Sequence, residues 1–195
     1  MHIETRVKAY HPVYIADYPF ADSLNNRVRP LLENYEDKQN RTSNVKATMT
    51  DWYITTPQIE RLRKFILNEI TSKIDASIKM IGDIKPFIPR FRDIWANVYR
   101  KGDYAVSHRH QPAVYSFVYF LKSRWFYSPL VFDDYGQKIR PRNGRYIIFP
   151  SYLRHSVPKH RYDDSRMTLS GNVYYDQICR EDWLSDSEDG MVSLI

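Results

Sequence analysis

Two histidines, His108 and His110, stand two residues apart in a segment rich in aromatic and β-branched residues. Side chains at i and i+2 of a β-strand point to the same face, so both imidazoles are predicted to project together, with Arg109 on the other face. Neutral imidazole is the commonest side-chain ligand of protein-bound metals. The pair therefore indicates part of a metal site, although two histidines at this spacing also occur by chance on protein surfaces.

A third histidine, His155, lies in the run Phe-Pro-Ser-Tyr-Leu-Arg-His-Ser-Val over residues 149–157. A strand is predicted to end at Pro150, and the following turn delivers His155. Eleven residues later, polar and apolar residues alternate from Arg166 onward. This alternation predicts a strand with a polar face, which in isolation would be exposed to solvent. The polar face carries Arg166, Thr168, Ser170 and Asn172.

Taken in chain order, His-x-His, a distal histidine and Arg-x-Thr resemble the double-stranded β-helix oxygenases that use Fe(II) and 2-oxoglutarate. The resemblance extends from about Trp95 to Tyr175. Within the superfamily, this stretch is similar to prolyl-hydroxylase-like members, among them oxygenases of marine phages and bacteria. Three segments carry it: His108–Pro112, Ser116–Leu121 and Phe149–Val157. The last is the most specific single piece, and the order of all the pieces is stronger than any one.

The resemblance implies a metal site and a cosubstrate site. Members of this superfamily hold Fe(II) on one face with two histidines and a carboxylate, which leaves positions for the cosubstrate and O₂. Arg166 would bind the far carboxylate of 2-oxoglutarate, because a guanidinium pairs with a carboxylate bidentately and an ammonium does not. Other hydrogen bonds to the cosubstrate or the substrate are expected from Thr168, Tyr99 and Tyr104.

His110 stands where the superfamily usually carries an aspartate or a glutamate. His110 could complete a three-histidine site, which leaves the metal centre one negative charge short. Alternatively only His108 and His155 bind, with water in the third position, or a carboxylate such as Asp103 or Asp133 substitutes. We favour His108, His110 and His155 as the metal ligands, because strand alternation points the first two the same way.

We therefore expect a dioxygenase that hydroxylates an amino-acid side chain, prolyl by resemblance, in a peptide or protein, with succinate and CO₂ as co-products. One alternative is a nucleic-acid-directed oxygenase, but such enzymes carry a second arginine six residues after the first, and that position is Asn172. The other alternative is a non-catalytic jelly-roll binding or structural module with a vestigial metal site. The expected partners are 2-oxoglutarate, O₂ and a peptide or protein, with nucleic acid less favoured and no membrane.

The candidate site residues are expected to lie on or beside short strands. After Pro86, aromatic and β-branched runs are separated by turns such as Arg142-Asn143-Gly144. Such strands, with no helices among them, predict an antiparallel sandwich, barrel or jelly roll, and the resemblance implies the double-stranded β-helix form of the jelly roll. The strands are predicted at Ile94–Arg100, Tyr104–His110, Val114–Leu121, Leu130–Asp133, Arg145–Pro150 and Arg166–Tyr175.

A helical flank is predicted before the strands, so the expected class is mainly β with N-terminal helices. Thr56 is a suitable N-cap, Pro57 suits the first helical position, and aliphatic residues recur at helical spacing as far as Met80. We expect one long amphipathic helix over residues 57–80 that buttresses the sheet, and a shorter helix within Arg27–Arg41. His160, in a basic loop-like stretch, is expected to be solvated.

The composition of the 195 residues, 43% hydrophobic and 27% charged, fits a single domain. We divide it into an arm and helical buttress (1–85), a β core (86–176) and an acidic tail (177–195). The net charge of +6 comprises −5 over residues 176–195 and +11 over the rest, including +5 over 140–166. One cysteine, no secretion signal and no bilayer-length apolar run indicate a soluble, intracellular protein, and the resemblance implies the cytoplasm of a bacterium or of a phage-infected cell.

Overall fold

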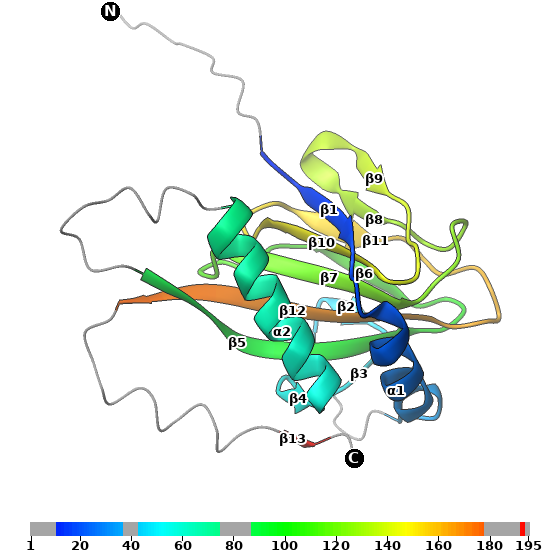
Figure 1. Cartoon of the computed structure of the whole chain (residues 1–195). Coiled ribbons are helices and arrows are strands. Elements are labelled where there is room, and N and C mark those ends of the chain that lie inside the picture. Colours follow the sequence, from blue (N-terminus) through cyan, green and yellow to red (C-terminus); the bar gives the residue numbers. More distant parts are fainter. Residues whose placement is uncertain (1–10, 37–42, 75–86, 178–191, 194–195) are drawn as a thin grey trace, which may run out of the picture.

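The computed structural model describes residues 11–36, 43–74, 87–177 and 192–193, which form layered β-sheets with helices packed on one side (Figure 1). Up to residue 74 the elements are β1 (Tyr14–Asp17), α1 (Ala21–Glu33), β2 (Val45–Lys46), β3 (Thr48–Met49), β4 (Ile54–Thr55), α2 (Pro57–Glu69) and a π-helical turn, η1 (Ile70–Ile74). They are followed by β5 (Phe87–Tyr99), β6 (Tyr104–His108), β7 (Tyr115–Lys122), β8 (Leu130–Phe132), a 3₁₀ turn, η3 (Asp133–Tyr135), β9 (Gln137–Ile139), β10 (Arg145–Pro150), β11 (His155–Val157), β12 (Arg166–Gln177) and β13 (Val192–Ser193).

Two antiparallel sheets build the body of the protein. One has six strands in the order β1-β10-β7-β12-β5-β3, and the other has five in the order β2-β6-β11-β8-β9. The long strands β5 and β12 pair along their whole length at the centre of this arrangement. Facing antiparallel sheets with this connectivity are a jelly roll, so the predicted fold is confirmed.

Strand alternation divides the apolar side chains between two cores. On β7, Phe117, Tyr119 and Leu121 face the helices, whereas Val118 and Phe120 face the five-stranded sheet. On β12, the apolar residues join the helix side, so its polar face points between the two sheets. That face is buried instead of solvent-exposed, because the second sheet covers it: Arg166, Thr168, Ser170 and Asn172 are all at most 9% exposed.

All six predicted strands are present, with bounds that differ by a few residues. The largest extension is at β5, which begins seven residues before the predicted Ile94. The most consequential difference is at β6, which ends at His108 and leaves His110 in the following loop. The sequence did not predict the short strands β9 and β11, because Gln137–Ile139 and His155–Val157 lack an apolar run such as the Leu-Val-Phe of β8.

One of the two α-helices begins where the sequence predicts, and the other begins earlier. The start of α2 is as predicted: Thr56 caps it by accepting a hydrogen bond from the Ile59 amide at 3.1 Å, and Pro57 is its first residue. Regular α-helix ends at Glu69, and residues 75–80 of the predicted helix lie outside the described residues. The helix expected within Arg27–Arg41, α1, covers Ala21–Glu33 and so starts before Arg27, and Leu24, Val28 and Leu32 form its buried face. Within the described ranges, no helix is long and apolar enough to cross a bilayer.

Candidate metal and cosubstrate site

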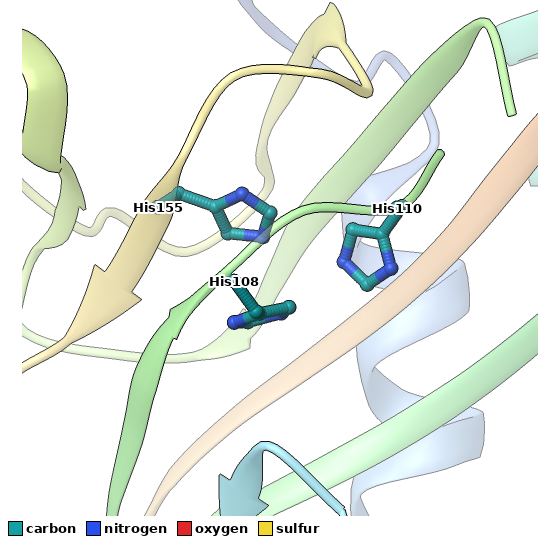
Figure 2. A group of neighbouring side chains, drawn as sticks. All are labelled: His108, His110 and His155. Atoms are coloured by element: carbon teal, nitrogen blue, oxygen red, sulfur yellow. The ribbon is translucent and has the colours of Figure 1, made fainter. Parts of the chain in front are cut away.

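Three histidines that are distant in sequence point toward one another between the two sheets (Figure 2). His108 is the last residue of β6, His155 is the first residue of β11, and the two are paired across the antiparallel ladder. One ring nitrogen from each of His108, His110 and His155 can be chosen so that all three lie within 4.8 Å of one another. This separation lets all three ring nitrogens reach a single metal ion.

A β-bulge on β6 aims His108 into the site. Ala105 pairs with Val157 and His108 pairs with His155, so three steps on β6 oppose two steps on β11. The extra residue reverses the alternation, which places His108 on the inner face with Ala105. Tyr104 stays on the opposite face, where its ring lies 5.7 Å from the Lys159 ammonium. Tyr104 therefore does not line the cavity, contrary to the expectation that it would bind cosubstrate or substrate.

His110 reaches the site from a loop and not from a strand. Its backbone N–H donates to the Ser151 carbonyl at 2.9 Å, and its own carbonyl accepts from the Ala113 N–H at 3.0 Å. The argument from strand alternation was therefore wrong for this residue. The convergence with His108 that it predicted is nevertheless present, with ring centroids 4.8 Å apart.

Two of the histidines have their tautomers fixed by the backbone. Nδ1 of His108 lies 2.7 Å from the Val106 carbonyl, and Nδ1 of His155 lies 3.0 Å from the Leu153 carbonyl. A carbonyl oxygen only accepts hydrogen bonds, so each Nδ1 carries the proton. The lone pair is then on Nε2, the atom left available as a metal ligand.

The surroundings keep the three imidazoles neutral. Burial, together with the smaller effect of neighbouring imidazoles, lowers the pKa of His110 to about 3 and that of His155 to about 4. Burial likewise lowers the pKa of His108 from its ordinary value. Because a metal binds the deprotonated ring nitrogen, these shifts leave the cluster ready for a cation at neutral pH.

No carboxylate belongs to this cluster within the described ranges. Asp133 accepts a hydrogen bond from the Ser156 hydroxyl at 2.7 Å, and Asp103 accepts one from the Arg100 N–H at the same distance. Both carboxylates considered as substitutes for His110 are thus engaged elsewhere. Three neutral donors are the set that the structure offers to a metal ion.

The cavity that holds the histidines also contains a buried arginine. Arg166 is 1% exposed, and its Nε and Nη1 atoms have no hydrogen-bond partner among the described residues. Its guanidinium carbon lies 4.8 Å from the ring centroid of Tyr99 and 5.2 Å from that of Phe120. Burial lowers the pKa of Arg166, and Tyr99 opposes that shift. A buried cation with free donors is costly unless an anion pairs with it, so this end of the cavity fits a carboxylate.

The remaining polar residues of the cavity come from β5 and β12. Tyr99 and Thr168 line it as expected, and Thr168 accepts a hydrogen bond from the Asn97 amide at 3.3 Å. Asn97 and Trp95 also line the cavity, although neither was predicted as a site residue from the sequence. Trp95 donates from its indole to Asn97 at 3.1 Å and packs 5.9 Å from the His110 ring. Their common i, i+2 spacing with Tyr99 was the available signal.

His160, by contrast, takes no part in the cluster, and it is not solvated as expected. It is 1% exposed, with Nε2 2.7 Å from the Asp164 carbonyl and its ring 4.8 Å from that of Tyr127. The basic residues beside it remain exposed. Its neighbours in sequence therefore gave a misleading indication of its burial.

A family model matches the part of the chain that contains two of these residues. Residues 133–172 match the model described as "Putative 2OG-Fe(II) oxygenase". This stretch includes His155 and Arg166 but neither His108 nor His110. No curated protein matches the chain.

Solved structures share the fold at low sequence identity. A Pseudomonas putida prolyl-4-hydroxylase has a TM-score of 0.62 and 16% identity, covering 85% of this chain and 94% of its own. A viral collagen prolyl hydroxylase from Paramecium bursaria Chlorella virus-1, in complex with 2-oxoglutarate, has a TM-score of 0.60 and 14% identity, covering 83% and 94%. A prolyl hydroxylase from Trichoplax adhaerens, in complex with a peptide fragment, has a TM-score of 0.53 and 15% identity, covering 83% of each chain.

The family match and the shared fold agree with the chemistry of the site. The match runs from η3 to β12 and carries the distal histidine and the buried arginine, while the fold brings the other two histidines to them. Over residues 133–172 the chain is similar to the 2OG-Fe(II) oxygenases, an enzyme class that uses Fe(II) and 2-oxoglutarate, and its fold is that of solved prolyl hydroxylases.

Proposed function

We propose that His108, His110 and His155 bind Fe(II) and that Arg166 binds the far carboxylate of 2-oxoglutarate, so that the protein acts as a dioxygenase. The observation that carries this proposal is the presence of both features in one cavity: three neutral imidazoles at one place and a buried guanidinium with unpaired donors at another. Bound Fe(II) with 2-oxoglutarate supplies O₂ activation coupled to oxidative decarboxylation of the cosubstrate to succinate and CO₂.

The chain's own residues would bind and orient the cosubstrate. Arg166 would fix the carboxylate with two parallel charge-assisted hydrogen bonds, and the sheets around it exclude water, which strengthens this pairing. Tyr99 lies beside the guanidinium and Thr168 lines the same cavity, and both would donate hydroxyl hydrogen bonds to the same ligand. These contacts fix one end of the cosubstrate, so its keto acid end is directed toward the histidines.

We further propose that the substrate is an amino-acid side chain, prolyl as the first candidate, in a peptide or protein. This part is supported by the three structural neighbours named above, which are prolyl hydroxylases. The single cysteine of the sequence is in keeping with a reducing compartment, so we propose the cytoplasm as the place of action.

The test is Fe(II)-dependent conversion of 2-oxoglutarate to succinate, measured with and without proline-containing peptides. We expect conversion by the wild-type protein, stimulation by a peptide that gains one oxygen atom in its mass, and no conversion by His108→Ala. A wild-type protein that binds no Fe(II) and behaves like His108→Ala would refute the proposal. Iron-dependent succinate formation that no peptide stimulates would refute only the substrate class.

A further inference from the structure

His110 differs from the other two histidines in what holds it. His108 and His155 are ends of paired strands, and backbone carbonyls fix their rings. His110 lies in a loop, and within the described part of the chain no hydrogen bond fixes its ring. The position of this imidazole therefore depends on how firmly its backbone is held.

One residue, Ser151, clamps both ends of that loop. Its carbonyl accepts from the His110 N–H at 2.9 Å, and its N–H donates to the Val114 carbonyl at 3.0 Å. The Val114 N–H in turn donates to the Val173 carbonyl on β12 at 2.9 Å. Ser151 lies in the turn between β10 and β11 that also leads to His155, so it connects the segments that carry two of the three histidines.

The side chain of Ser151 is the first link of a buried hydrogen-bonded chain. Its hydroxyl lies 3.0 Å from that of Ser116, and the Ser116 hydroxyl donates to the Asn172 side-chain carbonyl at 2.8 Å. Asn172 donates to Asp93 twice, from its backbone N–H at 2.7 Å and from its amide at 3.1 Å. The two serines and Asn172 are at most 4% exposed.

The direction of this chain follows from counting protons. Ser116 has one hydroxyl proton. It donates this proton in the hydrogen bond to Asn172, because a side-chain carbonyl can only accept. Ser151 must then donate to Ser116, so each hydroxyl has one defined orientation. A chain in which every donor has a single partner is rigid, and losing one link leaves buried polar groups unsatisfied.

We propose that Ser151, Ser116 and Asn172 are positioning residues that hold the loop carrying His110 at the metal site, with Asp93 as the anchor of their chain. This inference rests on the proposed function, because it takes His110 to be a ligand. It also gives Asn172 a role at the position where nucleic-acid-directed enzymes of the superfamily carry a second arginine. None of the three residues needs to touch the metal, the cosubstrate or the substrate to act in this way.

The test uses Co(II) as a spectroscopic probe in the full-length protein. We expect Ser151→Ala and Ser116→Ala each to weaken Co(II) binding about tenfold and to change the visible absorption of the bound ion, as loss of groups that orient a ligand does. Because the two serines are links of one chain, the double variant should be no weaker than the worse single variant. Ser151→Thr, which keeps a hydroxyl, should restore the wild-type spectrum.

Ser128→Ala is the matched control, because Ser128 is also buried and its hydroxyl donates to the Lys159 carbonyl at 3.2 Å, away from the cavity. It should lose some unfolding free energy but keep the Co(II) affinity and spectrum. Wild-type Co(II) binding that is unchanged in both serine variants, or weakened equally in Ser128→Ala, overturns this inference alone. A wild-type protein that binds no Co(II) overturns it together with the proposed function. If Ser151→Ala does not fold, Ser116→Ala carries the same expectation.

Discussion

At the scale of single residues, burial explains most of the chemistry of the site. The sequence predicted which residue types would meet, since His108, His155, Arg166 and Thr168 do lie in one cavity. It could not predict that Tyr104 would face away, because a one-residue bulge in β6 reverses the alternation. Nor could it predict that the third histidine would arrive from a loop. Both depend on contacts between segments that are far apart in sequence.

Substitution of Arg166 separates binding from stability. Arg166→Met removes a buried charge whose Nε and Nη1 atoms are unpaired, so the unfolding free energy of the metal-free protein should stay equal or rise. The same change should weaken 2-oxoglutarate binding by a factor of ~10–100, the loss expected for a charge-assisted pair. Calorimetric titration and chemical denaturation measure the two effects.

Arg145→Met is the control for Arg166→Met. Arg145 lies 3.9 Å from the Asp17 carboxylate at the edge of the six-stranded sheet, outside the cavity. The Arg145→Met substitution should leave the affinity for 2-oxoglutarate unchanged. An Arg166→Met protein that binds 2-oxoglutarate as tightly as the wild type would contradict the assigned role.

The lowered histidine pKa values predict how stability depends on pH without metal. His110 and His155 stay neutral in the folded protein down to about pH 4, whereas in the unfolded chain they take up protons below their ordinary pKa of 6.5. The unfolding free energy should therefore fall as the pH drops from about 6.5 toward 4, by up to about 1.4 kcal/mol per pH unit for each histidine. Denaturation in a chelator at several pH values checks this, and a double His110→Gln/His155→Gln variant should show a shallower slope. Equal slopes would count against the shifted values.

At the scale of elements, the central strand pair sets the shape of the cavity. Long strands with clear alternation, such as β12, were predicted well, because each face has one environment over many residues. The short strands β9 and β11 and the end of β6 were not, because pairing across the sheet decides them. The buried polar face of β12 could be identified as a site only after the second sheet was seen to cover it.

Gly171 tests how closely β12 packs. A Cβ there would lie 2.7 Å from the Asp93 carbonyl oxygen and 2.8 Å from Cε1 of Phe117. Gly171→Ala should therefore cost roughly 1–3 kcal/mol of unfolding free energy through overpacking. Gly136→Ala is the comparison, since its φ of +64° is strained for alanine but nothing lies within 4 Å, so about 1 kcal/mol is expected. Denaturation curves in which Gly171→Ala matches the wild type would contradict the packing.

At the scale of the whole molecule, the jelly roll separates an apolar core from a polar cavity. The helices and the outer face of the six-stranded sheet share an apolar core, while the space between the sheets holds the polar cavity. The sequence indicated this division through the predicted helical buttress and the alternating strands. The uneven charge, +11 over residues 1–175 and −5 over the last twenty, has one assigned part, Arg166, in the proposed cosubstrate site.

The central claim is that three histidines and Arg166 form one Fe(II) and 2-oxoglutarate site. The most direct measurement is anaerobic titration of the protein with Fe(II) and then 2-oxoglutarate, followed by the visible absorption of the chelate. We predict a band that requires both Fe(II) and 2-oxoglutarate, disappears in His108→Ala and needs more 2-oxoglutarate in Arg166→Met. A wild-type protein that gives no band and binds no Fe(II) would contradict it.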